Sequence, residues 1–381
     1  MSLLSQREQR KPQTVAQVII ERISKTYSRE QASSNGIYYW PDPLPTPIPQ
    51  LIPDPLVLFQ PAAASSVLMQ ALKEGSFGDD QQQRIAVLPT SLRDTVVQRG
   101  KSQAMDPLMR IPIGLVDMPE VQQRDVLWVD LHGSSGALSG GPLLIGGSQN
   151  SGKATALQCA LLWLFSRYTP QQLRCIVIDP NHDLDMFQDL PYLRDDDGTP
   201  LWIDGESDES IMQLEKCCVS MLTRRRERFP QQRWDEQTIQ QLWARGIELP
   251  LLLLIVSHYH SFVDRFSVVG GLKNMVLKFI EARTMGTYVI ISTAEVSSRH
   301  VSPDIMGKVG TKIGLFLNEQ QRYDLLGRTP SALEPIPGRG MVLTRDRSMH
   351  EVQLALPIEG PTEQARYEAL KNALAWLASQ K

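Results

Sequence analysis

A glycine-rich turn between two apolar segments carries the residues whose chemistry is clearest in this sequence. An apolar run at 142–145 leads into the turn, and a run of helical character begins at Lys153. Gly147 and the Gly152-Lys153 pair fit the pattern G-x-x-x-x-G-K, in which backbone N–H groups surround a phosphate and the lysine adds a charge. We therefore expect nucleotide phosphates to bind at Gly147, Ser148, Gln149, Asn150, Ser151, Gly152, Lys153, Ala154 and Thr155. The alternative is a strand–helix turn that contains glycine and binds nothing.

The metal-binding part of this pattern is missing. The residue after the lysine should be Ser or Thr, whose hydroxyl ligates Mg²⁺, and here it is Ala154. Thr155 lies one position on, about 100° around a helix, and is a poor substitute. The apolar run at 251–256 should end in an acidic pair, but Ser257 and His258 follow it. We therefore predict a site that binds ATP, with an uncertain requirement for Mg²⁺, no metal ligand of its own and little or no hydrolysis.

A nearby carboxylate is the feature that could restore catalysis. Asp179 ends a neighbouring apolar run and is the stronger candidate, and Asp264 is the weaker one. His258 and His260 could form a metal pair at a strand end, but no third ligand is visible in the sequence. The four cysteines show no metal-ligand spacing, which favours reduced, mostly buried thiols in a cytosolic protein.

Arginines at 224–226 and 228 form a basic run on an expected helix. A solvated helix face is the ordinary interpretation of such a run. The alternative is an arginine that reaches the nucleotide of a neighbouring module.

Composition places the chain among ordinary globular proteins. It has 381 residues, of which 42% are hydrophobic and 21% are charged, and a net charge of -3. That charge gives no general attraction to nucleic acid or to an anionic membrane. No apolar run approaches the roughly 20 residues that span a bilayer.

Apolar strands alternate with helices from residue 112 onward, which predicts an α/β fold with a mostly parallel sheet covered by helices on both faces. The expected strands are 112–116, 126–131, 142–145, 174–179, 250–256, 287–293, 310–317, 339–344 and 349–354, the last two as a hairpin. The expected helices are 153–168, 207–229, 272–283, 319–326 and 361–379.

The first part of the chain has a different character. Residues 38–61 are dense in proline, which locks the backbone and removes hydrogen-bond donors, so we expect an extended segment. Its apolar side chains indicate that it packs along its own domain or a neighbouring one. Short helices are expected at 62–80 and 89–99. We divide the chain into an N-terminal arm at 1–105, a nucleotide-binding domain at 106–357 and a C-terminal helix at 358–381.

Several segments together resemble the FtsK/SpoIIIE-type translocase ATPases, most closely one module of the EccC/EssC proteins of type VII secretion. They are IPIGLVDMPEVQQRDVLWVDL (111–131), IVIDPNHDLDMFQDLPYL (176–193), LTRRRERF (222–229), EARTMGTYVIIST (281–293) and LLGRTPSALEPIPGRGMVLTRD (325–346).

The resemblance implies a RecA-like P-loop fold and a turn near the base of ATP, formed by Pro337, Gly338, Arg339 and Gly340. It also implies partners among other ATPase modules, with the C-terminal signal of a secreted substrate as a possible further partner, and a cytoplasmic location in proteins anchored to the membrane. Related modules with degenerate motifs hold ATP and act as structural or regulatory elements. Ala294 stands where motor relatives carry a sensing glutamine.

The sequence leaves three alternative functions for this chain. The first is an ATP-binding, hydrolysis-impaired module of a secretion translocase, acting in assembly, regulation or substrate recognition. The second is an active DNA or protein translocase motor, against which the net charge and the absence of a winged helix weigh in the case of DNA. The third is an interaction scaffold that binds no nucleotide.

Overall fold

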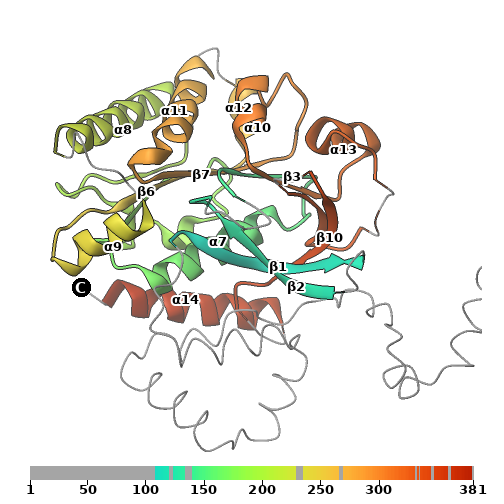
Figure 1. The fold of residues 1–381 in the computed structure, drawn as a ribbon, viewed down its shortest axis with the longest axis horizontal. Coiled ribbons are helices and arrows are strands. Elements are labelled where there is room, and N and C mark those ends of the chain that lie inside the picture. Colours follow the sequence, from blue (N-terminus) through green and yellow to red (C-terminus); the bar gives the residue numbers. More distant parts are fainter. Residues whose placement is uncertain are drawn as a thin grey trace, which may run out of the picture. The chain divides into compact units, whose positions relative to one another are not determined.

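The fold is seen in a computed structural model of the chain (Figure 1). It describes residues 108–119, 123–133, 140–228, 235–265, 269–330, 333, 335–344, 347–358 and 362–379. Except for Met118, Pro119, Gln123 and Arg124, these residues belong to one compact unit. The proline-rich segment at 38–61 and the helices expected at 62–80 and 89–99 lie outside the described residues.

The described residues contain one ten-stranded sheet with the strand order β2-β1-β10-β9-β8-β3-β7-β6-β4-β5. Its strands are β1 (Arg110–Met118), β2 (Gln123–Asp130), β3 (Leu143–Gly147), β4 (Leu173–Ile178), β5 (Trp202–Ile203), β6 (Leu251–Val256), β7 (Thr287–Thr293), β8 (Thr311–Leu315), β9 (Arg339–Leu343) and β10 (Met349–Leu354).

The six strands from β8 to β5 run parallel. Strands β3, β6 and β7 are buried along their whole length, which explains their nearly unbroken apolar sequences. Because parallel strands end at the same edge, the segments that follow β3, β4, β6, β7 and β8 gather at one carboxyl edge of the sheet. β7 separates β3 from β6.

The other side of the sheet is antiparallel. β9 and β10 form the predicted hairpin, β9 also pairs with β8, and β10 pairs with β1. The strand expected at 112–116 therefore joins the antiparallel part of the sheet, and the prediction of a mostly parallel sheet is confirmed by the six parallel strands.

Helices cover both faces of the sheet. α8 (Asp208–Arg228), α10 (Tyr259–Arg265), α11 (Val269–Glu281), α12 (Pro303–Lys308) and α13 (Glu319–Leu326) lie on one side, and α7 (Lys153–Arg167) and α14 (Glu363–Ser379) on the other (Figure 1). The remaining helices are α9 (Glu236–Ala244), η2 (Asp185–Phe187), η3 (Pro191–Leu193) and η4 (Ala282–Met285). In the part of the chain that the structure describes, no helix is long and apolar enough to cross a bilayer.

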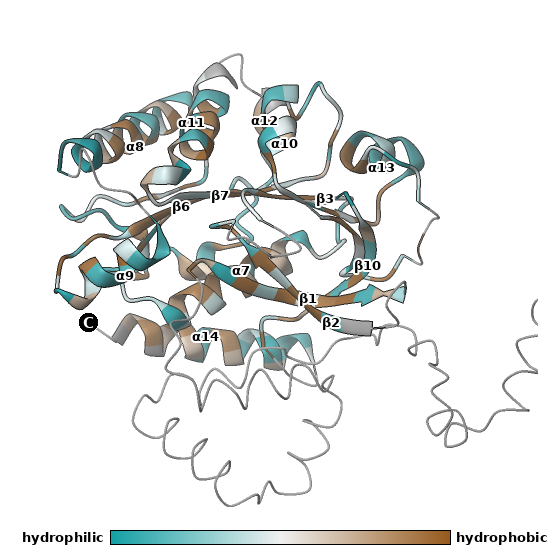
Figure 2. Ribbon diagram, viewed as in Figure 1, coloured by the Kyte–Doolittle hydropathy of each residue, from teal (hydrophilic) through white to brown (hydrophobic). Residues whose placement is uncertain are grey.

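Alternate residues of the strands point to opposite faces of the sheet, and each face packs against its own layer of helices. One set of strand residues packs with the inner faces of α8, α10 and α11, as Leu252, Leu254 and Val256 do on β6. The hydropathy colouring shows the same layering, with apolar strands and with polar outer faces on helices such as α8 (Figure 2). The spacing of Leu157, Ala160, Leu161 and Leu164 predicted a buried helix face on α7, and all four are buried.

Short helices were missed by the sequence analysis. α9 begins at the capping residue Asp235, which accepts a hydrogen bond from the Thr238 N–H at 2.8 Å. α12 begins with Pro303 after Ser302, a common start signal. Only Ser257 and His258 separate α10 from the end of β6, so no recognisable linker marked the boundary in the sequence.

Candidate functional site

The loop from β3 to α7 has the backbone of an anion site. Gly152 caps α7 in a left-handed conformation with a φ of 101°, and no side chain caps the helix. The first N–H groups of a helix have no partner within the helix, so they remain available to an anion. A Cβ atom on Gly147 would lie 2.7 Å from the Leu315 carbonyl oxygen, so only glycine fits there.

Two hydroxyl groups of this loop are buried and unused. Among the described residues, the Oγ atoms of Ser148 and Ser151 have no hydrogen-bond partner. A buried hydroxyl without a partner is unfavourable, and a bound phosphate would supply the missing acceptor. These two atoms therefore fit the phosphate group that the loop pattern predicts.

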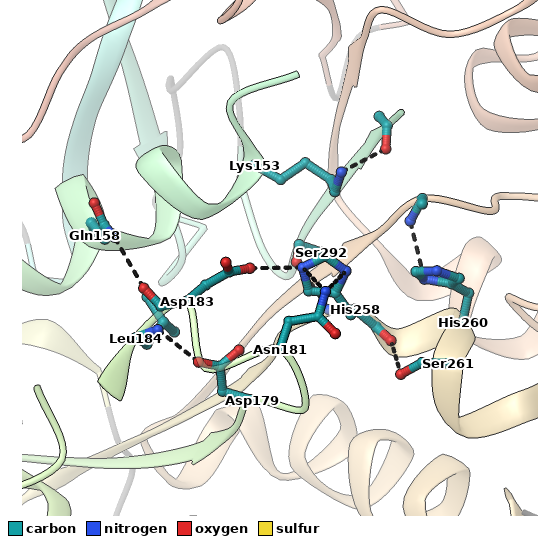
Figure 3. A network of polar contacts seen from close by, with 12 residues as sticks. Lys153, Gln158, Asp179, Asn181, Asp183, Leu184, His258, His260, Ser261 and Ser292 are labelled. Atoms are coloured by element: carbon teal, nitrogen blue, oxygen red, sulfur yellow. Dashed lines mark hydrogen bonds and ion pairs between the residues drawn. The ribbon is translucent and has the colours of Figure 1, made fainter. Parts of the chain in front are cut away.

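The Lys153 side chain folds back onto the loop between β3 and α7. Its Nζ atom donates hydrogen bonds to the carbonyl oxygens of Gly147 and Ser148, each at 2.7 Å. Burial lowers the pKa of Lys153 to about 8, although the Asp183 charge acts in the opposite direction. The ammonium group points toward the ends of the central strands (Figure 3).

The turn before β9 touches the loop through Gly338. The Gly338 N–H donates to the Ser151 carbonyl oxygen at 2.8 Å, and Gly338 has a φ of 79°. A Cβ atom on Gly152 would lie 3.1 Å from the Gly338 nitrogen, so the two glycines allow the turn and the loop to pack together. Pro337 is exposed beside them.

The other two residues of this turn have structural contacts. Arg339 donates from Nε to Gln353 at 3.0 Å and from Nη1 to Glu351 at 3.1 Å, which holds its guanidinium group against β10. Gly340 pairs with Leu315 within the sheet. The structure thus brings Pro337 and Gly338 to the loop and keeps Arg339 and Gly340 with the strands.

The end of β6 lacks the expected carboxylates. Ser257 is fully buried, and its N–H donates to the Ile178 carbonyl oxygen at 2.9 Å. Asp179 ends the adjacent β4 and accepts a hydrogen bond from the Leu184 N–H at 2.7 Å. Burial raises the pKa of Asp179, and Asp183 raises it further.

His258 faces the loop after β4. Its Nε2 atom lies 2.8 Å from Oδ2 of Asp183, and the Asn181 amide nitrogen lies 3.3 Å from both ring nitrogens (Figure 3). The His258 backbone is left-handed, with a φ of 48°, and its N–H donates to Ser292 Oγ at 3.3 Å. Asp183, Asn181 and Ser292 were missed by the sequence analysis because their roles depend on contacts with a residue far along the chain.

His260 completes this cluster as a neutral group. Its Nδ1 atom accepts a hydrogen bond from the Ala294 N–H at 3.2 Å. Burial and the nearby positive charges of His258 and Lys153 lower the pKa of His260 to about 4. Gln321 on α13 donates to the Ala294 carbonyl oxygen at 3.3 Å. The same side chain takes part in the capping box of α13, so its position is also set by the start of that helix.

The hydroxyl and the carboxylate that the loop motif normally supplies to magnesium are absent from positions 154 and 257, and Asp179 and Ser257 are oxygen-bearing side chains that remain at this edge. The side chain of Ala154 has no oxygen, and Asp183 already contacts His258. The Asp179 Oδ1 and Ser257 Oγ atoms are buried, and the Ser257 hydroxyl lies close enough to the Asp179 carboxyl to lower its pKa, so the two residues offer one carboxylate and one neutral hydroxyl. Within the same residues, no group of three or more His, Cys, Asp or Glu could hold a metal ion. The side chain of Asp264, the weaker candidate, is outside what the structure describes.

The arginine run lies at the opposite edge of the sheet. Arg225 is buried and donates to the carbonyl oxygens of Met285 at 2.8 Å and of Pro250, which precede β7 and β6. Arg224 pairs with Asp195 at 2.8 Å. These residues therefore do not reach the phosphate loop of their own domain.

Left-handed residues other than glycine gather at the carboxyl edge. Six such residues occur in the described part of the chain, and four of them follow the ends of β3, β4, β6 and β8: Asn150, His182, His258 and Phe316. Asparagine and histidine adopt this conformation more readily than most residues, so Phe316 is the member of the four whose backbone is strained.

Comparison with known proteins shows which proteins this chain resembles. The sequence profile of the FtsK/SpoIIIE family matches residues 99–354. The ESX secretion system protein EccC of Geobacillus thermodenitrificans is 26% identical over 268 residues, which are 68% of this chain and 16% of that protein. The DNA translocase FtsK of Campylobacter jejuni is 24% identical over 210 residues, 52% of this chain and 20% of that protein. The chain thus spans a small part of the length of the relatives that it matches.

Solved structures show the same fold. ATPases 2 and 3 of EssC from Geobacillus thermodenitrificans align with a TM-score of 0.59 at 22% identity, over 72% of this chain and 50% of that one. ATPases 2 and 3 of Thermomonospora curvata EccC, in complex with a signal sequence peptide, align with a TM-score of 0.55 at 21% identity, over 73% of this chain and 48% of that one. The fold is that of a RecA-like P-loop ATPase domain, and with the match over residues 99–354 the chain belongs to the FtsK/SpoIIIE family.

Proposed function

We propose that this chain is an ATP-binding module with little or no hydrolysis, part of an EccC-like type VII secretion translocase. The observation that carries the proposal is that the site keeps its phosphate-binding residues but lacks its usual metal ligands. Lys153 and the loop retain the geometry for phosphate, while Ala154 and Ser257 stand where metal ligands are needed.

Catalysis is further weakened at His258. P-loop enzymes need a polar group that orients the attacking water, together with a metal ion that bridges the phosphates. Here the imidazole is held by Asp183 and Asn181. We infer that nucleotide stays bound and acts as a structural or allosteric ligand.

The proposed division of the chain assigns residues 106–357 to the nucleotide-binding domain, 1–105 to an arm and 358–381 to a C-terminal helix. Pro337 and Gly338 would flank the nucleotide on the side of β9, because the Gly338 N–H bonds to the loop. Arg339 and Gly340 would support this turn from the sheet.

The relatives suggest the partners. Two structural neighbours comprise ATPases 2 and 3 of their proteins, and one of the two was solved with a signal sequence peptide. We propose that this module contacts neighbouring ATPase modules on the cytoplasmic side of the membrane. We propose further that it binds the C-terminal signal of a secreted protein.

Calorimetric titration with ATP, in Mg²⁺ and in EDTA, followed by a phosphate-release assay, tests the proposal. We expect binding in both buffers and no appreciable turnover. Turnover that Lys153→Ala abolishes would identify a working motor and contradict the proposal. An absence of binding at millimolar ATP would favour a nucleotide-free scaffold.

A further inference from the structure

Phe316 occupies a particular place beside the phosphate loop. The last residue of β8, Leu315, pairs with Gly147 on one side and with Gly340 on the other. Phe316 is the next residue, so it lies at the carboxyl edge between the loop and the turn that precedes β9.

The side chain of Phe316 is turned outward there. Leu315 and Leu317 on either side of it are buried, whereas Phe316 is 53% exposed. Its backbone is left-handed, with a φ of 46°, a conformation that asparagine or glycine adopts readily and a phenylalanine does not. One exposed aromatic residue needs no explanation, but an exposed and strained one at a ligand-binding edge calls for one.

The two sides of the loop differ in chemistry. Toward β7 and β6 lie Lys153, His258 and Asp183, which are polar and suit phosphates. Toward β8 and β9 the exposed residues Phe316 and Pro337 offer apolar surface. A bound nucleotide with its phosphates in the loop would find the exposed Phe316 ring on the second side.

We propose that Phe316 is the stacking platform for the base of the bound nucleotide, an inference that rests on the proposed nucleotide binding. Aromatic side chains stack on any base, because every base has a π face. The site therefore accepts purine nucleoside triphosphates with little discrimination between adenine and guanine. The strained backbone keeps the ring out of the core and available to the base.

Separate titrations with ATP and with inorganic tripolyphosphate test this role, since only ATP carries a base. Phe316→Gly removes the ring and tolerates the left-handed backbone, and Phe316→Asn is a second variant of the same kind. We expect ATP affinity to fall about tenfold in both, as loss of a stacked base predicts, with tripolyphosphate affinity unchanged.

Phe316→Tyr, which keeps the ring, and Tyr367→Ala, which removes an exposed aromatic side chain from the regular helix α14, should both retain wild-type ATP affinity. An unchanged ATP affinity in Phe316→Gly would overturn the inference and leave the proposed phosphate binding intact. Equal losses for both probes would overturn it as well. If the wild type bound neither probe, the proposed function itself would fail.

Discussion

The Nε2 atom of His258 lies 2.8 Å from the Oδ2 atom of Asp183, and this contact joins the end of β6 to the loop that follows β4. Both residues lie close to Lys153, whose pKa responds to the Asp183 charge. The Asp183 carboxylate at this edge is therefore engaged by the His258 side chain. The predictions below begin from that arrangement.

Restoring the missing oxygen ligands should restore a response to magnesium. In the variant Ala154→Ser/Ser257→Asp/His258→Asp, the new carboxylate at position 257 adjoins Asp179, so the two charges should repel each other without a cation. We expect tighter ATP binding in Mg²⁺ than in EDTA and a Tm that Mg²⁺ raises. Ala154→Ser alone, the control, should show neither effect. An identical response to Mg²⁺ in the triple variant and the wild type would mean that the strand end at 257 does not face the phosphates.

Removing the Lys153 charge should abolish most of the phosphate affinity. Charge-assisted hydrogen bonds contribute about 1.5–3 kcal/mol each, so Lys153→Met should weaken ATP binding by at least about tenfold in calorimetric titrations. Lys312→Met serves as the control, because Lys312 is a half-buried lysine within β8 that lies outside the loop. Comparable losses in the two variants would point to general electrostatics rather than to a built phosphate site.

ATP affinity should fall above pH 8. Burial lowers the pKa of Lys153 to about 8 from its usual 10.5, so the ammonium group loses its proton in this range. The same shift makes the nucleotide-free fold more stable as the pH rises from about 8 toward 10.5, since the unfolded chain then binds more protons. Calorimetry in buffers of different ionisation enthalpy should detect proton uptake on binding at pH 8.5. Lys153→Arg should flatten the profile, and a profile that stays unchanged in this variant would assign the titration to another group.

The strained backbone at Phe316 should be measurable as a stability difference. Phe316→Gly and Phe316→Ala both lose the ring, but only glycine adopts a φ of 46° without strain. We expect the free energy of unfolding in urea to be about 1 kcal/mol higher for the glycine variant. Equal stabilities would indicate that the backbone relaxes at little cost when the ring is absent.

Arg225 should support the fold and leave the nucleotide site unaffected. Arg225→Met removes a buried donor to the carbonyl groups that precede β6 and β7, so the free energy of unfolding should fall by about 2–3 kcal/mol. ATP affinity should not change. The exposed Arg226 provides the matched variant, since Arg226→Met should leave stability almost unchanged. A loss of ATP affinity in Arg225→Met would contradict its placement at the far edge of the sheet.

Local signals made much of this fold predictable. The loop pattern at Gly147–Lys153 lies within a few residues of sequence, and the spacing of the apolar residues on α7 is equally local. The hairpin of β9 and β10 was predicted because its strands are close in the chain. The place of β1 beside β10 could not be predicted, since it depends on a pairing across more than two hundred residues.

The site was predictable only in part for the same reason. The absence of metal ligands at Ala154 and Ser257 follows from the motif alone. The contact between His258 and Asp183 joins residues 75 positions apart and depends on the strand order. Phe316 carries no motif, and its significance comes from a backbone angle that the sequence does not display.

The two hydrogen bonds from Lys153 to the carbonyl oxygens of Gly147 and Ser148 hold its ammonium group close to the loop. An arriving anion must draw the ammonium group away from partners that it already has, so binding is an exchange rather than a simple gain. A singly charged anion offers little in return for those two bonds, whereas a triphosphate offers several charged oxygens at once. We therefore expect the loop to favour ligands that carry several negative charges, so that small singly charged anions compete poorly with a nucleotide.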